Sequence, residues 1–408
     1  MDFQTTPIQR DFYIEELFNS DSNSKYSLNF IFKLESSNAL SIDQVRQSIV
    51  DVIQNQPIMS GIADIKDSNV IIRKGKLKNS VVEIETVQNS NIIFEDDSIF
   101  QHTFSLIDHQ PLFRCKLIDK EGSLYILLAV HHFVFDFFSC KAWAQQIVNR
   151  IDGTQSSMKE NAIMEENYTL EQFRERASNV KAQKILNNRF HGIKKISQNP
   201  FQRFEEQGYF NFNQNISLGN NLTKTQQSSL ILSAFGLEYL NETNNDHMLI
   251  GVPVPNRTRH NKDIITSAVI TFPVLISRKN NFVESYVSIK RQLLENLRLQ
   301  FFDYTRYFPS YCSFPIMFTY YTSNYSMHSI KTTIKLEKYF TIDPPSPVHI
   351  MLDSQQNVFG KIDKRFFEED YYVQSMKRLK EGIRYVLWEF LWNYKEKNGI
   401  RTLRKHSL

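Results

Sequence analysis

The pattern of apolar and polar residues along this chain switches between a period of two and a helical period. Ser27–Leu34 alternates apolar and polar side chains in the way of a half-buried strand. Gln44–Gln54 has apolar residues at helical spacing; it follows a capping serine, Ser41, and ends before Pro57. The beginning of the chain therefore predicts a strand followed by a helix.

The same reasoning extends along the chain. Two apolar runs separated by Glu121-Gly122 predict a hairpin, because short polar turns containing glycine join antiparallel strands. Phe282–Gln300 predicts an amphipathic helix with Val283, Val287, Leu294 and Leu297 at helical spacing. The remaining strands are predicted at Val70–Arg73, Val81–Thr86, Leu112–Leu117, Leu124–Val130, Met248–Val254, Ile264–Ile276, Pro315–Tyr321 and Val348–Asp353, and the remaining helices at Ser139–Arg150, Leu170–Phe190, Gln226–Tyr239 and Asp370–Tyr394.

The order of these elements predicts a mixed α/β protein with two lobes of similar size. The chain has 408 residues, which exceeds what a single compact core usually holds. A polar, irregular stretch over residues 152–167 is the candidate boundary. We therefore predict an N-terminal lobe over 1–165 and a C-terminal lobe over 166–408.

Composition and charge exclude several classes of protein. Hydrophobic residues make up 41% and charged residues 23%, as in ordinary soluble proteins. The net charge is +4, and the densest basic clusters, Arg257–Lys262 and Arg401–Lys405, are short, so no nucleic-acid partner is expected. Cys115, Cys140 and Cys312 are too few and too far apart for a disulfide framework or a zinc site.

Targeting signals are also missing from the pattern. Met1–Pro7 has neither a basic region nor an apolar core, so it does not resemble a signal peptide. The longest apolar stretch, Leu124–Phe138, is interrupted by polar residues and is too short to span a bilayer. We expect a soluble, cytoplasmic protein that does not contact membranes.

Candidate chemistry lies where the strand Leu124–Val130 runs into two adjacent histidines, His131 and His132, followed by Asp136. Polar groups at the mouth of a buried strand are costly unless they have partners. A lone histidine there would more often satisfy backbone groups, but the pair followed by a carboxylate favours acid–base chemistry near neutral pH. Neighbouring residues on a strand point to opposite faces, so the pair does not predict a metal site.

This segment resembles the HHxxxDG motif of chloramphenicol acetyltransferase and of the condensation domains of nonribosomal peptide synthetases. Three further segments are similar to condensation-domain elements and occur in the same order. They are Thr6–Tyr13 for the opening S/T-x-x-Q-x-R-x-W/F element, Ile250–Arg257 for I-G-x-P-x-x-x-R, and Ile270–Ile276 for the G-x-F-V-N-T-L-P segment. The chain is thus identified as resembling a stand-alone condensation domain over nearly its whole length.

The resemblance implies two chloramphenicol-acetyltransferase-like lobes in a V shape, with a tunnel between them. In that arrangement His132 takes the proton of an attacking amine or alcohol, or holds this nucleophile in line with an acyl thioester. Asp136 would pair with Arg257 and tie the motif to the second lobe, and His131 would be a framework residue. No cofactor would be bound; a partner acyl or peptidyl carrier protein would supply a phosphopantetheine arm. A monomer acting in natural-product biosynthesis is expected.

Departures from the family pattern leave alternatives open. The glycine of the motif is Phe137 here, and Phe137, Phe138 and Ser139 are candidates for narrowing the tunnel or altering the environment of the oxyanion. Asn55–Gly61 and Phe302–Phe308 replace two further family elements. Amide and ester formation are not separated by sequence. The alternatives are a non-catalytic carrier-docking protein, an acyltransferase using soluble acyl-coenzyme A, and, ranked lower, an epimerase. Cys140 as a nucleophile is disfavoured against a buried structural role.

Overall fold

A computed structural model describes residues 2–18, 25–56, 58–75, 82–87, 94–101, 103–154, 158–193, 203–216, 222–308, 314–320 and 325–397. Cys312 and the basic cluster Arg401–Lys405 lie outside these residues. No helix among the described residues is long and apolar enough to cross a membrane.

Helices and strands alternate along the described part of the chain. The strands are β1 (Asp2–Gln4), β2 (Ser27–Ser36), β3 (Gly61–Lys66), β4 (Asn69–Lys74), β5 (Val82–Val87), β6 (Phe113–Lys120), β7 (Ser123–His131), β8 (Tyr209–Asn215), β9 (His247–Pro255), β10 (Val269–Ser277), β11 (Ile316–Tyr320), β12 (Ser326–His328), β13 (Thr332–Phe340), β14 (Val348–Leu352) and β15 (Asn357–Asp363). The helices are α1 (Pro7–Phe18), α2 (Ile42–Asn55), α3 (Ser98–Gln101), α4 (Phe137–Ile151), α5 (Met158–Arg176), α6 (Val180–Phe190), α7 (Lys224–Thr243), α8 (Phe282–Asn296) and α9 (Glu369–Lys397), with 3₁₀ turns at Phe94–Asp96 and Leu297–Leu299.

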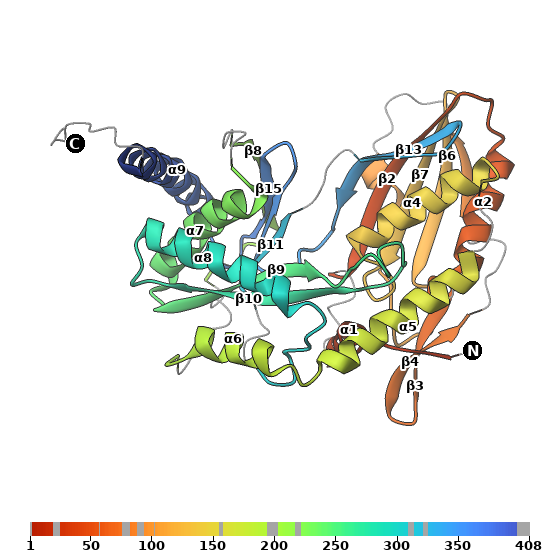
Figure 1. The fold of residues 1–408 in the computed structure, drawn as a ribbon. Coiled ribbons are helices and arrows are strands. Elements are labelled where there is room, and N and C mark those ends of the chain that lie inside the picture. The colour runs from red at the N-terminus through yellow and green to blue at the C-terminus, as the bar shows by residue number, and fades with distance from the viewer. Residues whose placement is uncertain are drawn as a thin grey trace.

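Two six-stranded sheets form the frame of the molecule, and Figure 1 shows them in separate halves of the view. The first has the order β12-β13-β2-β7-β6-β5, and the second has the order β10-β9-β11-β14-β15-β8. A small third sheet has the order β1-β4-β3. Helices α2 and α4 lie beside the first sheet, and α7, α8 and α9 lie on the side of the second (Figure 1). This arrangement confirms the predicted mixed α/β class.

The first sheet contains two strands from the C-terminal half of the chain. β13 pairs antiparallel with β2, placing Leu336 opposite Phe32, and β12 pairs with β13 beyond it. Ile334 and Leu336 are buried in the same core as Phe32. The two sheets therefore do not divide the chain at one point, and the boundary between 1–165 and 166–408 stays a prediction.

Most predicted elements are confirmed within a few residues. The hairpin of β6 and β7 turns at Glu121 and Gly122, which both have positive φ, 52° and 81°. Two successive residues of positive φ match the right-handed twist of the flanking strands, which is the geometry of a tight hairpin. The hairpin brings β7 to the centre of the first sheet, between β2 and β6.

Three predictions differ from the structure. The predicted single helix Leu170–Phe190 is two helices, because Asn179 caps α6 by accepting a hydrogen bond from the Ala182 amide. The stretch 152–167, predicted to be irregular, includes the start of helix α5 at Met158. The strand predicted at Ile264–Ile276 begins only at Val269, and residues 264–268 form a buried connection.

Helix α8 exposes much of the apolar stripe that predicted it. Val287, Leu294 and Leu297 are about half exposed, whereas Tyr286 and Ile289 are buried against the second sheet. The helical spacing of the stripe correctly predicted the helix. Which face packs on the sheet was decided by the tertiary arrangement.

Candidate active site

Strand β7 delivers two histidines to the edge of the first core. The amide of His131 donates to the carbonyl of Leu112 at 2.8 Å, and the amide of His132 donates to the carbonyl of Tyr26 at 2.7 Å. The chain leaves the sheet directly after these bonds and reaches helix α4 at Phe137. Adjacent residues on a strand face opposite ways, so the two imidazoles have different surroundings.

His131 is a fully buried framework residue. Its Nδ1 accepts the amide proton of Phe133 at 3.0 Å, so the ring hydrogen resides on Nε2 when the imidazole is neutral. Burial lowers the pKa of His131 to about 3, which keeps the ring neutral at physiological pH. Nε2 faces the carboxyl group of Glu16 at 3.8 Å, and the pKa of this buried carboxyl is raised by burial.

His132 is only partly buried and lies between two elements from distant parts of the sequence. Its Nδ1 is 3.3 Å from the hydroxyl of Ser267, and its ring centroid is 5.2 Å from that of Phe12 on α1. Burial lowers the pKa of His132, although the charge of Asp136 acts in the opposite direction. A neutral, partly accessible imidazole can accept a proton at neutral pH.

Asp136 caps helix α4 and at the same time forms an ion pair. Its Oδ1 accepts the Ser139 amide and the Nη2 hydrogen of Arg257, each at 2.7 Å, and its Oδ2 accepts the Ala268 amide at 3.1 Å. The Asp136 side chain is 1% exposed and that of Arg257 is 6% exposed. The carboxylate therefore fixes the start of α4 and also holds the 257–268 segment against it.

Arg257 extends the same network into the 257–268 segment. Its Nη1 donates to the carbonyl of Ile264 at 2.7 Å, and its Nη2 lies 3.2 Å from the carbonyl of Thr266. The Ser139 hydroxyl lies within the network, 3.0 Å from Arg257 Nη2 and 2.8 Å from the Thr266 carbonyl. Ser139, a candidate for the oxyanion region, is thus engaged in holding the segment in place.

Gln9 is a buried residue of α1 that contacts the histidine motif, and the sequence analysis did not single it out. It closes a capping box on α1, because its amide lies 3.3 Å from the Thr6 hydroxyl and its Oε1 accepts the Thr6 amide at 2.8 Å. Its Nε2 donates to the carbonyl of Phe133 at 2.9 Å and lies 3.3 Å from Thr266 Oγ1. Gln9 belongs to the family-like opening segment, but no local pattern indicates its remote partners.

Phe137 is the first residue of α4 and does not have a positive φ. The conformational freedom of the family glycine is therefore not required at this position. The Phe137 ring instead joins an aromatic cluster, with centroid separations of 5.6 Å to Tyr339, 6.0 Å to Tyr325 and 6.5 Å to Phe30. Phe138 is 38% exposed, and the Arg257 guanidinium lies 5.8 Å from its ring centroid.

Cys140 lies in the buried part of α4. Its sulfur is 2.5 Å from the Tyr325 hydroxyl, and burial raises the pKa of the thiol. A raised pKa disfavours the thiolate, the nucleophilic form, in agreement with the structural role expected for this residue.

In segment 302–308, which replaces one of the family elements, Asp303 pairs with Arg306 at 3.1 Å and lies 3.8 Å from Arg10.

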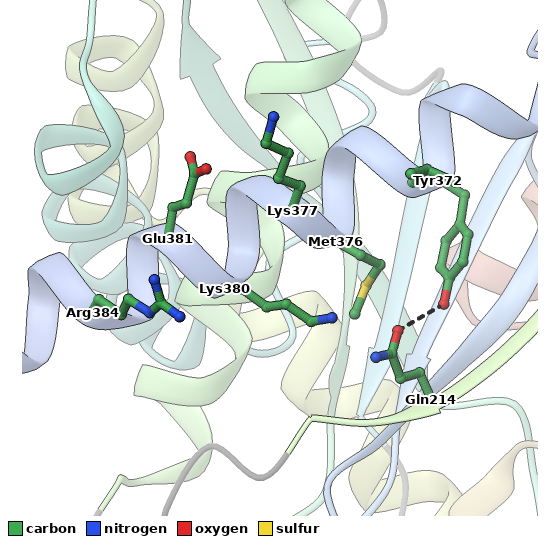
Figure 2. A pocket seen from close by; sticks show the side chains of 8 residues that line it. Gln214, Tyr372, Met376, Lys377, Lys380, Glu381 and Arg384 are labelled. Carbon is green, nitrogen blue, oxygen red and sulfur yellow. Dashed lines mark hydrogen bonds between the residues drawn. The ribbon is translucent and has the colours of Figure 1, made fainter.

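A separate pocket lies on the second half of the molecule, between α9 and β8. Figure 2 shows Lys380, Met376 and Tyr372 reaching from the helix towards Gln214 on the strand, where the Tyr372 hydroxyl and Gln214 are 3.1 Å apart. None of its lining residues belongs to the histidine motif or to the 257–268 segment. The pocket therefore plays no part in positioning His132.

The whole architecture is similar to solved condensation domains. The starter condensation domain of rhizomide synthetase RzmA, as a mutant in complex with C8-CoA, matches with TM-score 0.74 and 11% identity over 94% of each chain. A further mutant of that domain, in complex with C8-CoA and Leu-SNAC, matches with TM-score 0.70 and 10% identity over 94% of each chain. The condensation domain of the Monacolin K polyketide synthase MokA matches with TM-score 0.70 and 11% identity, over 94% of this chain and 96% of that one.

At these identities the structural matches describe the fold alone. A comparison with curated proteins found no match. The family model of the condensation domain, however, matches residues 2–306, about three quarters of the sequence. Taken together with the fold, this match shows that the chain belongs to the condensation domain family.

Proposed function

We propose that this protein transfers an acyl group from a thioester to an amine, with an alcohol as the chemically close alternative acceptor. Condensation domains are acyltransferase-type domains that work with carrier proteins and acyl donors. The observation that carries the proposal is the state of His132, a neutral and partly accessible imidazole held between Phe12 and Ser267. The donor would be a thioester on the phosphopantetheine arm of a carrier protein, in a natural-product pathway.

In the proposed step, the amine nitrogen attacks the thioester carbonyl and forms the new C–N bond. With Nδ1 beside Ser267, Nε2 of His132 is the nitrogen that takes the amine proton or orients the amine. The C–S bond then breaks, and the departing sulfur receives a proton, so that a free thiol is released. Aminolysis of a thioester is favourable, so placement of the two reactants supplies much of the acceleration.

The proposal requires the donor and the acceptor to reach His132 from different directions, along the tunnel implied by the family resemblance. Two observations support this requirement. The His132 side chain retains partial exposure, and it lies between α1 and the 257–268 segment, which the Asp136–Arg257 pair holds against the motif. A site bounded by elements remote in sequence suits two substrates that arrive separately.

The first test is intact-mass spectrometry of an acyl-loaded carrier protein incubated with this protein and a pool of amines. We expect loss of the acyl group from the carrier and a matching amide product, and His132→Ala should lower the rate by about 10²–10⁴-fold. His328→Ala, which removes an exposed imidazole from β12, serves as the matched control and should retain the wild-type rate. An unreacted carrier with the wild-type protein, across donors and acceptors, would refute the proposal.

The Phe137 ring favours one second candidate, a carrier-docking protein without turnover. In that case carrier binding would persist in His132→Ala, and neither form would release product. A soluble donor is the other alternative, because the RzmA starter domain is described in complex with C8-CoA. Presenting the same acyl group on coenzyme A and on a carrier, side by side, separates these donors by their kcat/KM.

A further inference from the structure

Helix α1 turns one buried face towards the histidine motif. Gln9 and Glu16 are separated by about two helical turns, so they lie on the same side of the helix. Gln9 is 0% exposed and Glu16 is 2% exposed. Phe12 lies between them in sequence, and its ring packs against the imidazole of His132. Glutamate and glutamine are seldom fully buried, and each needs a hydrogen-bonding partner where it is.

The carboxyl group of Glu16 uses one oxygen in a hydrogen bond and directs the other towards His131. Oε1 accepts the amide hydrogen of Leu106 at 2.7 Å. Oε2 lies 3.8 Å from Nε2 of His131, and both atoms are buried without a hydrogen-bond partner among the described residues. A buried donor and a buried acceptor are each costly alone, and a small side-chain rotation would let these two satisfy one another.

His131 transmits this contact to the backbone that follows His132. Its Nδ1 accepts the Phe133 amide hydrogen at 3.0 Å, so the ring hydrogen lies on Nε2, the nitrogen next to Glu16. The Phe133 carbonyl accepts a hydrogen bond from Gln9 at 2.9 Å. The residue after His132 is therefore held from α1 on both sides, at its carbonyl by Gln9 and at its amide through the His131 ring.

We propose that Glu16 is a positioning residue, which fixes the tautomer and orientation of the His131 ring and thereby the place of His132. The site presents two donors, the Leu106 amide and Nε2–H of His131, and a carboxylate offers an acceptor to each. The contact stands on its own geometry, but its consequence for catalysis rests on the proposed acyl transfer. A displacement of a catalytic group by about 1 Å can lower a rate by roughly 10²-fold.

The tautomer of His131 tests the contact without requiring turnover. Glu16→Gln keeps the size of the side chain but replaces one acceptor with an NH₂ donor. With the remaining oxygen on the Leu106 amide, this NH₂ group would face Nε2 of His131 and drive the ring hydrogen to Nδ1. We therefore expect a protonated Nε2 in wild type and a protonated Nδ1 in Glu16→Gln.

Nitrogen–proton correlation spectra of protein labelled in its histidines distinguish the two tautomers. Burial raises the pKa of Glu16, although hydrogen bonds with the 105–107 segment act in the opposite direction, so the spectra are best recorded at about pH 8 to favour the carboxylate. Loss of signals in His131→Asn assigns the ring. If that variant does not fold, wild type and Glu16→Gln still show whether a buried histidine changes its tautomer. The same tautomers in both proteins would overturn the inference.

Turnover tests the consequence for His132. We expect Glu16→Gln to lower kcat by about ten- to a hundredfold with little change in KM for the acyl donor, because the reacting geometry is affected more than binding. In the His131→Asn background the same substitution should have no further effect, because the connection is already lost. Glu238→Gln is the matched control, since it removes a buried carboxylate that pairs with Arg378 in the second half, and it should keep the wild-type kcat.

The outcomes separate the positioning role from the proposed reaction. A wild-type kcat in Glu16→Gln, or a loss that adds in full to that of His131→Asn, would refute the positioning role. A wild-type protein that transfers no acyl group would refute the proposed reaction, and the tautomer spectra would then decide the contact between Glu16 and His131 by themselves.

Discussion

Phe137 occupies the position of the motif glycine. The site differs from the family pattern in the side chain at this position and not in the backbone conformation. Its backbone does not have the positive φ that would require glycine. Its ring fills space beside Tyr339, Tyr325 and Phe30 within five residues of His132. In the proposed acyl transfer, we expect a ring at this place to restrict the volume available to the acyl group.

We therefore expect Phe137→Gly to broaden the range of acyl donors towards longer chains. The ratio of kcat/KM for a long donor to that for a short donor should rise by about tenfold or more, because each accommodated methylene is worth roughly 1–3 kcal/mol. Steady-state rates over a series of acyl chain lengths measure the ratio. Val287→Ala, which shortens an exposed apolar side chain on α8, is the control. An unchanged ratio in Phe137→Gly would show that the ring does not set donor size.

The lowered pKa of His132 predicts the pH dependence of the reaction. In the proposed reaction the neutral imidazole is the active form, and a pKa below the ordinary value of 6.5 keeps it neutral as the pH falls towards that value. The rate should therefore be flat from about pH 8 to 6.5 and decline about tenfold per pH unit only below the lowered pKa. A kcat/KM profile with a phosphate-free thioester and an alcohol acceptor, or an amine whose own pKa lies below the range measured, reports this limb without a contribution from protonation of the acceptor. A midpoint above 6.5 would contradict the assigned environment of His132.

At the scale of elements, the start of α4 is joined to the 257–268 segment by one carboxylate. Asp136 serves as helix cap and as the ion-pair partner of Arg257, and Arg257 in turn holds the carbonyls of Ile264 and Thr266. Breaking a buried ion pair leaves an uncompensated charge in the interior. The position of Ser267 beside His132 therefore depends on this pair.

We expect Asp136→Asn to lower the free energy of unfolding by about 3–5 kcal/mol, because Arg257 would remain buried without its partner. Asparagine is itself a good helix cap, so loss of the cap contributes little. Urea denaturation measures the change. Asp263→Asn breaks an exposed pair with Lys262 on the same segment and should cost less than about 1 kcal/mol. Equal effects of the two substitutions would contradict the role of the Asp136–Arg257 pair.

Helix α5 contains a buried carboxyl group whose protonation should affect stability. Burial raises the pKa of Glu166 to about 8, so the folded state retains a proton that the unfolded state releases above about pH 4.5. The free energy of unfolding should therefore fall as the pH rises from about 5 to 8. Glu166→Gln should reduce this dependence and stabilise the protein at pH 8 by on the order of 2–4 kcal/mol. Part of the dependence should remain, because burial also raises the pKa of Glu165 and that of Asp11 to about 7. Urea unfolding of both proteins at pH 5 and pH 8 is the measurement, and a wild type without any stability difference between them would refute it.

At the scale of the whole molecule, two strands from the C-terminal half of the chain belong to the first sheet. β12 and β13 complete the first sheet after the chain has already built most of the second, and β13 buries Ile334 and Leu336 in the first core. Without them β2 becomes an edge strand and Phe32 loses a covering neighbour. The first half therefore depends on residues from the end of the second.

We expect a fragment of residues 1–165 to lack a cooperative unfolding transition, because the uncovered edge of β2 exposes backbone and apolar groups. Near-ultraviolet circular dichroism should show no fixed environment for the buried Trp143, in contrast to the full chain. A cooperative transition with a native-like Trp143 signal would instead establish 1–165 as an independent domain, as the sequence analysis predicted.

The sequence by itself determined the local elements and the residue types of the site. Periods of two and 3.6 are local properties, so β2, the β6–β7 hairpin, α4 and α8 could be predicted from neighbouring residues. The adjacent histidines, Asp136 and Arg257 were identified from short segments that resemble the family's motifs. These inferences need no knowledge of how distant segments meet.

Only the tertiary structure decided which distant residues surround His132 and which strands complete each sheet. Ser267 lies 135 positions from His132, and Gln9 reaches Phe133 across 124 positions. β13 joins β2 across most of the chain, and the packed face of α8 differs from its apolar stripe. Local patterns specify that a strand or helix buries a face, but the partner depends on shape and hydrogen bonding over the whole fold. For that reason the catalytic candidate and, through the family resemblance, the Asp136–Arg257 pair were predictable from the sequence, whereas the positions of Ser267 and Gln9 beside the motif were not.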